Sequence, residues 1–337
     1  MRYKLAAFGG VLLAMIFLAC VTIFGNASYI TQSDLDNINN RDTMVKVAQI
    51  MLKDTERTNE ITAEEIKDIT VIYGDYMGEG IKEAAINADF GAGYVLLSVY
   101  QNKTEKRYDY IGEIGVFLNT SNIKNINLDN LNGDTLFLNE KITEKIGSFE
   151  TLIYNKGYAF DKRTKSFNNI YNYPTEITAD WNLLWEATVN DAPSRWEKLT
   201  QTTKSVLESG SRPVIRNTYH QEYLVSSETE VLNTPLDNTY SLISQRDVEE
   251  SFYWSDEWKA FILGEKIENS TGEKVAVLTL WKNLPYYLAN VSESVETATS
   301  EYNNLVRIRR KNGQVAIVNN SSLSDIRKNT TQTEPNV

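Results

Sequence analysis

Cysteine and histidine are almost absent from this sequence of 337 residues, and each shortage excludes a class of chemistry. Cys20 is the only cysteine, so an intramolecular disulfide cannot form. His220 is the only histidine, which excludes zinc sites built on several histidines. Because Cys20 lies within an apolar run, cysteine–histidine catalysis is excluded by location. The Gly-x-Ser-x-Gly and P-loop motifs are also missing, so we expect no catalytic residue, no metal and no cofactor.

Basic residues are outnumbered, with 34 Lys and Arg against 45 Asp and Glu and a net charge of −11. Nucleic-acid binding needs a basic surface, so no nucleic-acid partner is expected. The same excess of acid disfavours docking on anionic lipid head groups. Small secreted animal domains usually carry several disulfides, so the single cysteine favours a bacterial envelope protein.

One long apolar run extends from Leu5 to Phe24, and it follows two basic residues, Arg2 and Lys4. A helix needs about 20 apolar residues to cross a bilayer, whereas the core of a cleaved signal peptide has roughly 7–15. The basic flank keeps the N-terminus in the cytoplasm. The run therefore predicts a single-pass signal-anchor, with residues 28–337 on the extracytoplasmic side, at the cell surface or in the periplasm.

Two other fates of this run stay open. The small residues Gly-Asn-Ala before position 28 fit cleavage after Ala27, which would give a secreted protein. Cys20, which follows Ala19, is a candidate lipid-attachment site of a lipoprotein. Phe17 and Leu18 are bulkier than lipoprotein signals prefer, and the residues after Cys20 remain apolar. An inert apolar residue of a membrane helix is therefore the competing interpretation of Cys20.

Hydrophobic periodicity predicts an α+β protein, in which an N-terminal membrane helix is followed by two domains, each with helices and an antiparallel sheet. The polar, turn-rich segment 154–174 is interpreted as the connection between the domains. The C-terminal tail has few apolar residues and is predicted to be disordered. The expected parts are 1–27 as anchor or signal segment, 28–160 as the first extracytoplasmic domain, 175–319 as the second, and 320–337 as the tail.

Four predicted helices support this fold class. An apolar stripe behind an N-cap at Ser33 predicts a helix over 33–55. Thr62 and Glu65 form a capping-box pattern that predicts a second helix, reaching Tyr73. In the second half, helices are expected from Thr178 onward and over 193–209.

The predicted strands are β-branched and aromatic runs separated by turn residues. An Asn-Gly pair at 312–313 predicts a hairpin over 305–318 with a type I′ turn. The Asn-rich segment 119–134 is interpreted as an extended surface loop. The other strands are expected at 94–100, 108–118, 135–138, 151–155, 213–219, 221–227, 258–268 and 274–281.

Aromatic residues are plentiful, with 19 tyrosines and six tryptophans. Exposed aromatic side chains bind carbohydrates or extended peptides and anchor protein interfaces. Two dense segments, 251–261 and 280–290, supply a candidate exposed binding patch, with burial in a sheet as the competing interpretation. The residues of this candidate patch are Trp254, Trp258, Trp281, Tyr286 and Tyr287.

These observations favour a non-enzymatic extracytoplasmic protein that is held in the membrane by its N-terminal helix and has protein partners in the envelope. We expect a scaffold or a subunit of a bacterial envelope, pilus, secretion or conjugation assembly. The first alternative is an extracytoplasmic protein that binds a carbohydrate or peptide ligand. The second is an acid-based cell-wall hydrolase, since a catalytic carboxylate pair is defined by spatial proximity rather than by a sequence motif.

Overall fold

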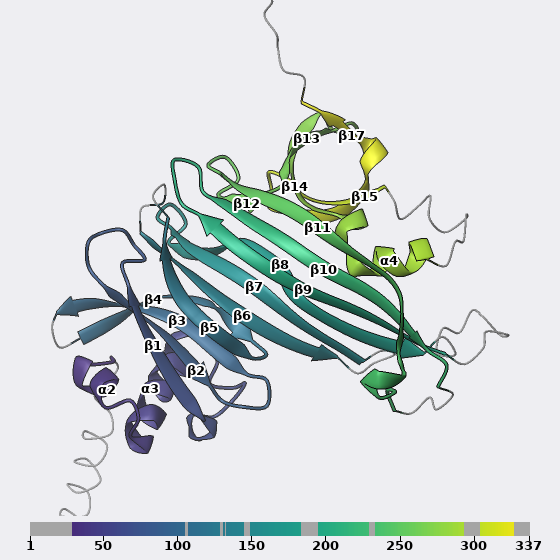
Figure 1. Ribbon diagram of the computed structural model, residues 1–337. Helices are drawn as coiled ribbons and strands as arrows, with labels where there is room; N and C mark the ends of the chain where they lie inside the picture. The colour runs from purple at the N-terminus through teal and green to yellow at the C-terminus, as the bar shows by residue number, and fades with distance from the viewer. Residues whose placement is uncertain are drawn as a thin grey trace, which may run out of the picture. The chain divides into compact units, whose positions relative to one another are not determined.

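The chain folds mainly into antiparallel β-sheets, and few of its residues are helical (Figure 1). The computed structural model describes residues 29–104, 107–128, 131, 133–144, 149–182, 195–228, 233–292 and 304–326. The predicted α+β fold class is therefore wrong, because segments expected to be helical are strands. Residues 1–27, with the predicted anchor, lie outside the described part. Within that part, no helix is long and apolar enough to span a bilayer.

Contacts divide the chain into two compact units. The first contains residues up to Asp75 together with Gly80–Val116. The second contains Tyr76–Glu79 and everything from Phe117 onward. The segment 154–174, interpreted above as a connection, lies instead in two paired strands inside the second unit.

The first unit packs helices on a four-stranded antiparallel sheet in the order β1-β2-β3-β4. Helix α3 begins at an N-cap, Asn40, and its apolar stripe includes Val47, Met51 and Leu52. These side chains share one buried core with residues of β2 and β3 such as Ile86 and Leu96. The elements are α2 (Gln32–Asp36), α3 (Arg41–Asp54), η1 (Ala63–Glu65), β1 (Asp68–Gly74), β2 (Glu83–Asp89), β3 (Val95–Thr104) and β4 (Arg107–Phe117).

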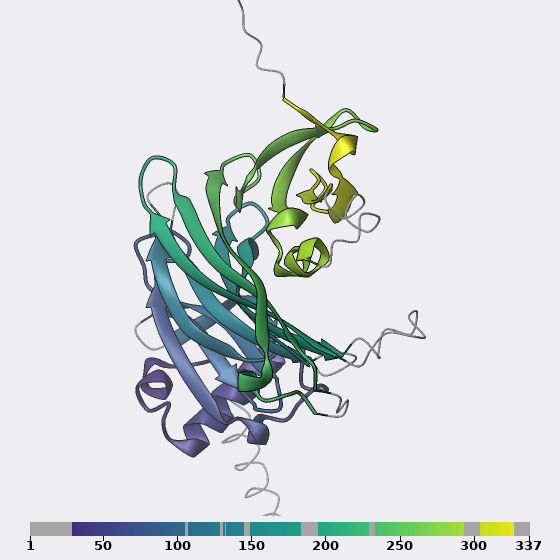
Figure 2. The ribbon, with the colours of Figure 1, turned by 45° about the vertical axis from the view of Figure 1, so that its right-hand side comes forward.

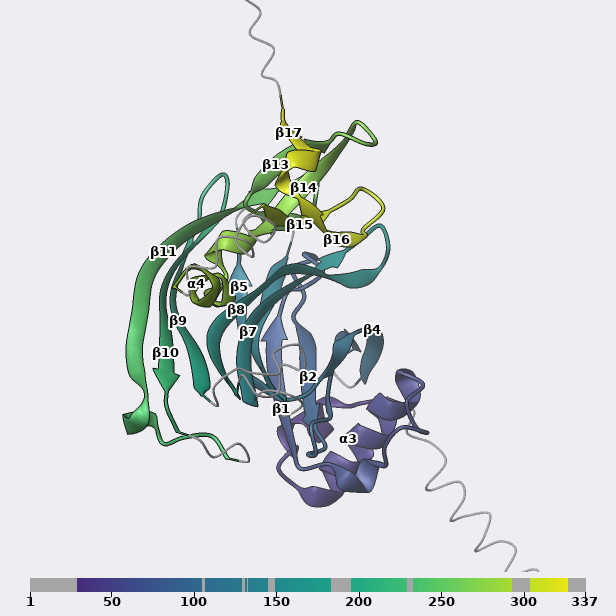
Figure 3. The ribbon, with the colours of Figure 1, turned by 90° about the vertical axis from the view of Figure 1, so that its right-hand side faces the viewer.

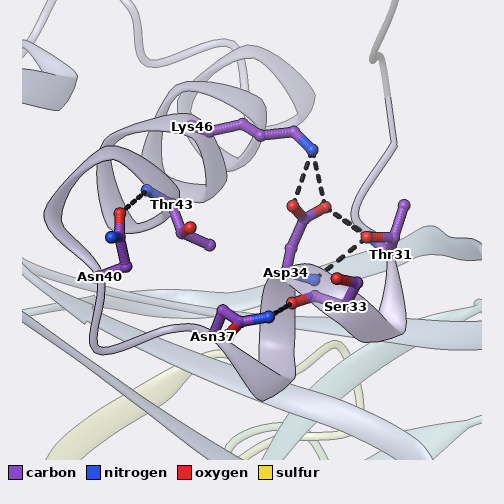
Figure 4. Close-up of polar contacts among 7 residues, drawn as sticks. All are labelled: Thr31, Ser33, Asp34, Asn37, Asn40, Thr43 and Lys46. Carbon is purple, nitrogen blue, oxygen red and sulfur yellow. Dashed lines mark hydrogen bonds and ion pairs between the residues drawn. The ribbon is translucent and has the colours of Figure 1, made fainter.

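The predicted helix over 33–55 corresponds to α2 and α3, but its N-cap is Thr31 rather than Ser33. Thr31 and Asp34 form a capping box, in which the Asp34 N–H donates to Thr31 Oγ1 at 3.1 Å and the Thr31 N–H donates to Asp34 Oδ2 at 2.9 Å (Figure 4). Lys46 of α3 donates to both oxygens of Asp34, at 2.7 and 2.9 Å. This ion pair fastens the two helices to each other.

The second predicted helix is wrong beyond its first turn. Thr62 and Glu65 do form a capping box, but the turn is the single 3₁₀ turn η1. The chain then becomes strand β1, in which Ile69 is buried against the helices and Val71 packs on the same core. The β-branched residues of this segment suit a pleated strand better than a helix.

The second unit is built on one eight-stranded sheet, in which each strand pairs with the next strand along the chain (Figures 1 and 2). Its spatial order is β12-β11-β10-β9-β8-β7-β6-β5. The strands are β5 (Thr120–Asn127), β6 (Asp134–Glu144), β7 (Phe149–Asp161), β8 (Ser166–Asn182), β9 (Trp196–Glu208), β10 (Val214–Ser226), β11 (Ser241–Ser255) and β12 (Ala260–Ile262).

Two predicted helices and one predicted loop are strands of this sheet. Thr178, expected to open a helix, lies inside β8, and residues 196–208 of the other expected helix form β9. Val206 of β9 is 46% exposed. In β9 the side chains alternate between the two faces of the sheet, with the period of two that defines a strand. Half of the Asn-rich segment predicted as a loop, Thr120–Asn127, is β5.

A smaller five-stranded antiparallel sheet follows, in the order β16-β15-β14-β13-β17. Valine, isoleucine and leucine side chains from β14, β15 and β17 form its core. The short η4 (Trp281–Asn283) and helix α4 (Pro285–Ser292) come between β14 and β15. The strands are β13 (Gly264–Glu268), β14 (Glu273–Leu280), β15 (Leu305–Arg309), β16 (Val315–Asn319) and β17 (Leu323–Asp325).

The predicted hairpin over 305–318 is confirmed as β15 and β16, but the turn type is not. Gly313 has a φ of +85°, whereas Asn312 is not among the residues with positive φ, so the turn is not type I′. The predicted disordered tail is also wrong in part. Residues 320–325 form a 3₁₀ turn and β17, and residues 327–337 lie outside the described part.

Candidate functional site

The concave face of the eight-stranded sheet is occupied by helix α4 (Figure 3). Leu288 and Ala289 of α4 pack on Leu199 of β9 and Tyr223 of β10. The concave side chains are apolar or aromatic over much of this face, whereas the convex side chains of β9 to β11 are mostly polar and largely exposed. This alternation is typical of an antiparallel sheet that is covered on one side.

A buried polar cluster lies among the aromatic side chains of the concave face. Tyr173 donates its hydroxyl hydrogen to Glu250 Oε2 at 2.6 Å, and Asn283 of η4 donates to Glu250 Oε1 at 2.5 Å. Asn217 donates to the hydroxyl oxygens of Tyr171 and Tyr219, both at 2.7 Å. Burial raises the pKa of all three tyrosines well above its ordinary value, so they remain protonated.

A second group of polar contacts holds η4 and the start of α4 on the sheet. Gln221 donates to Gln201 Oε1 at 2.8 Å and to the main-chain oxygen of Asn283 at 2.6 Å. Arg246 donates to Gln221 Oε1 at 2.7 Å and to the carbonyl oxygen of Leu284 at 2.8 Å. Its guanidinium also lies over the Tyr287 ring, 5.3 Å from the centroid. These hydrogen bonds, together with the contact between Arg246 and Tyr287, hold the 281–289 segment on the sheet.

The outer edge of β11 offers unpaired backbone groups over most of its length. Only Tyr253–Ser255 of β11 pair with β12, so most of the strand has β10 on one side and no strand on the other (Figures 1 and 3). Trp254 donates its N–H to the Pro213 carbonyl oxygen on the β10 side. Backbone direction alternates along a strand, so Gln245, Asp247 and Glu249 direct their N–H and C=O groups outward. Among the described residues, no group hydrogen-bonds to these outward groups.

The five residues of the predicted aromatic patch do not form one exposed surface. Trp254 and Trp258 are buried, at 3% and 8% exposure. Trp281, Tyr286 and Tyr287 are half-buried. Trp254 lies in the aromatic core of the sheet, and Trp258 packs with β12 and β14, where its indole N–H donates to Glu265. The Tyr286 ring lies against Trp181, and the Tyr287 ring lies under the guanidinium group of Arg246. Both rings therefore help to hold α4 on the sheet.

A pocket of about 250 Å³ has Trp254 among its lining residues. It lies at the end of the sheet where the β7–β8 hairpin turns. Its wall combines aromatic rings with polar and charged groups. The lining residues include Tyr76, Phe160, Asp161, Lys162, Asn168 and Lys259.

The other sequence candidates lie away from these features. His220 is on the exposed convex face, where its Nδ1 is 2.9 Å from Asp247 Oδ1, and this hydrogen bond raises the pKa of the imidazole. Cys20 lies outside the described residues. Within the described ranges, no group of three or more His, Cys, Asp or Glu side chains could hold a metal ion.

The β11 edge was missed in the sequence because 241–252 was not predicted as a strand. A signal was present: Val248, Phe252 and Trp254 lie on one side of a period-two pattern, and Asp247 and Glu249 lie on the other. Comparison of the chain with protein-family models, with curated proteins and with solved structures found no match.

Proposed function

We propose that this protein is a non-enzymatic, membrane-tethered subunit or scaffold of a bacterial envelope assembly, and that it binds a partner by accepting a strand at the outer edge of β11. The apolar run from Leu5 to Phe24 supports the tether and the extracytoplasmic location. The free edge of β11 carries the binding proposal. A partner segment that adds to such an edge gains a ladder of main-chain hydrogen bonds.

The charges along this edge indicate what kind of segment it accepts. Asp247 and Glu249 are both exposed on the convex face beside the outward-facing backbone groups. Like charges directly opposite one another destabilise a strand pair, so two β11 edges should repel each other. A partner strand with Lys or Arg side chains at the opposing positions would instead gain favourable cross-strand pairs. The proposed partner is therefore an extended, basic segment of another envelope protein.

The test is a photo-crosslinking experiment on the full chain in the membranes of cells that produce it. A photoreactive amino acid at Gln245 should form an adduct with an envelope protein, whereas the same group at Lys204, on the convex face of β9, should not. Glu249→Pro should abolish the adduct, because proline removes an outward N–H and leaves the bonds to β10 intact. Glu249→Ala is the matched control, since it removes the same charge and keeps the N–H.

The proposal requires the adduct to depend on the backbone of the edge. Equal crosslinking from Gln245 and Lys204, or an adduct that survives Glu249→Pro unchanged, would contradict it.

Intact-mass measurement of the mature N-terminus tests the tether separately. A chain that retains residue 1 supports an anchor, a chain beginning at Ser28 indicates secretion, and a lipid-modified Cys20 indicates a lipoprotein.

A carbohydrate-binding function is a second candidate, favoured by the pocket near Trp254. Aromatic rings beside carboxylate, amide and ammonium groups are the mixture that sugar hydroxyls and apolar ring faces require, and Tyr76, Phe160, Asp161 and Asn168 supply it here. Ligand binding to the folded state raises the melting temperature. Thermal-shift measurements with cell-wall saccharides should show such a rise, and Phe160→Ala should remove it.

A further inference from the structure

A groove between the eight-stranded sheet and the smaller sheet of the second unit contains two arginines that have no anionic partner among the described residues. Two adjoining hollows, of about 70 and 200 Å³, make up this groove, and Asn172 and Arg307 line both of them. Arg307 and Arg309 are separated by one residue on β15, on the face opposite the buried Val306 and Ile308. The groove is therefore lined by β8 on one side and by β15 on the other.

The two guanidinium groups are unusual in a chain with a net charge of −11. Their neighbour Arg310 binds Glu268 through two hydrogen bonds, of 2.8 and 2.6 Å. Within the described part of the chain, by contrast, neither Arg307 nor Arg309 has a side-chain hydrogen bond or an ion pair, and Nε of Arg309 is buried. Leaving a buried donor unsatisfied costs about 1–3 kcal/mol, so an arginine in this position is expected to have a ligand.

The surroundings of the pair favour an anion. No Asp or Glu is among the described residues that line either hollow. Burial lowers the pKa of Arg309, and the positive charge of Arg307 lowers it further. A bound anion would offset both causes of the lowered Arg309 pKa, because its negative charge would lie beside the two guanidinium groups. The planar guanidinium group of arginine can donate two parallel hydrogen bonds to a pair of oxygens on a carboxylate or phosphate.

The larger hollow is mainly apolar, and Arg307 is the only charged residue among the described residues that line it. Trp281, Leu284, Pro174 and Ile317 line it together with Tyr154. Such a wall binds hydrocarbon rather than a hydrated ion. The arrangement thus places a cationic end and an apolar end in one groove.

We propose that this groove binds a small organic anion, whose carboxylate or phosphate head contacts Arg307 and Arg309 and whose apolar body lies against Trp281 and Leu284. The site is independent of the β11 edge and of the pocket near Trp254. It makes the protein a receptor for an amphipathic small molecule, in addition to any strand partner.

The test uses the full chain in lipid nanodiscs and four water-soluble probes: hexanoate, hexyl phosphate, hexanol and inorganic phosphate. Calorimetry should show one-to-one binding of at least one of the two six-carbon anions, and binding of hexanol and inorganic phosphate at least tenfold weaker. Tighter binding of hexanoate would identify a carboxylate head, and tighter binding of hexyl phosphate a phosphate head.

Substitutions locate the binding. Arg307→Gln and Arg309→Gln should each weaken it about tenfold or more, because each removes a charge-assisted contact. Arg163→Gln removes the same charge from the exposed β7–β8 turn and should leave affinity unchanged. Since Arg307 is exposed, its variant should fold normally even if the Arg309 variant does not. Equal binding of hexanol, equal loss in Arg163→Gln, or the absence of any anion binding would overturn the proposal.

Discussion

Gly157 of β7 lies directly against the ring of Phe137 on β6. A Cβ atom on Gly157 would be 2.8 Å from Cζ of Phe137 and 2.9 Å from Cε1, closer than carbon atoms pack in proteins. The two residues are also cross-strand partners. The absence of a side chain at Gly157 is therefore what allows the Phe137 ring to occupy this position and join the aromatic core.

Gly157→Ala should destabilise the second unit by about 1–3 kcal/mol, because the Phe137 ring must move out of a packed core. Gly264→Ala is the control, since nothing lies within 4 Å of the position that its new methyl carbon would occupy and its φ is not in the left-handed region. The midpoint of chemical unfolding measures both. Equal unfolding midpoints for the two variants would contradict the prediction, because they would show that the core accommodates the added methyl group without loss of stability.

Tyr173→Phe should destabilise the same unit by about 1–3 kcal/mol. The substitution removes the hydroxyl that donates to Glu250 Oε2 at 2.6 Å and leaves that buried oxygen one donor short. Tyr253→Phe, at a 36% exposed position on the convex side of β11, removes a hydroxyl in water and should change the stability by less than about 0.5 kcal/mol. A Tyr173→Phe unfolding midpoint at the wild-type value would mean that the concave cluster contributes little to holding η4.

The pKa of His220 should be above its ordinary value of about 6.5, chiefly because of the hydrogen bond to Asp247. Since the folded-state pKa is raised, the protonated pair stabilises the fold below about pH 6.5, and this contribution is lost as pH rises through the folded pKa. The effect on stability should be small, because the pair is exposed.

The single imidazole makes this measurement direct, since only one histidine signal titrates in the proton NMR spectrum. Asp247→Asn should lower the midpoint of that titration toward about 6.5. Glu249→Gln, two positions further along the convex face and not among the groups that shift His220, should leave it in place. An unchanged midpoint in Asp247→Asn would mean that the hydrogen bond does not form in solution.

Local signals were sufficient for parts of the fold. The helical segment 33–55, which the structure divides into α2 and α3, the strands at 94–100 and 108–118 and the hairpin at 305–318 depend on caps, β-branched runs and a turn glycine, which act over a few residues. The free edge and the arginine groove were not predictable in this way. Whether β11 has a neighbour depends on where β12 ends, and whether Arg309 has a partner depends on strands far away in the chain.

The string Glu-Ile-Thr-Ala occurs twice in the sequence and adopts a different structure each time, so the local sequence alone does not determine its structure. At 60–63 it leads into the 3₁₀ turn η1, and at 176–179 it lies within β8. In β8, Ile177 and Ala179 are buried while Thr178 between them faces the other side. Pairing with β7 and β9 satisfies the backbone of this copy, so its helix-opening residues never form a cap.

Composition and local pattern establish which chemical groups are available: one thiol, one imidazole, an excess of carboxylates and one long apolar run near the N-terminus. They do not establish which of the remaining side chains meet. The tertiary structure alone buries Trp254 and Trp258, leaves the β11 edge open and places Arg307 and Arg309 beside Asn172. The reason is physical: burial and strand pairing are set by contacts between segments distant in sequence, and these contacts outweigh the small local preferences of any one segment.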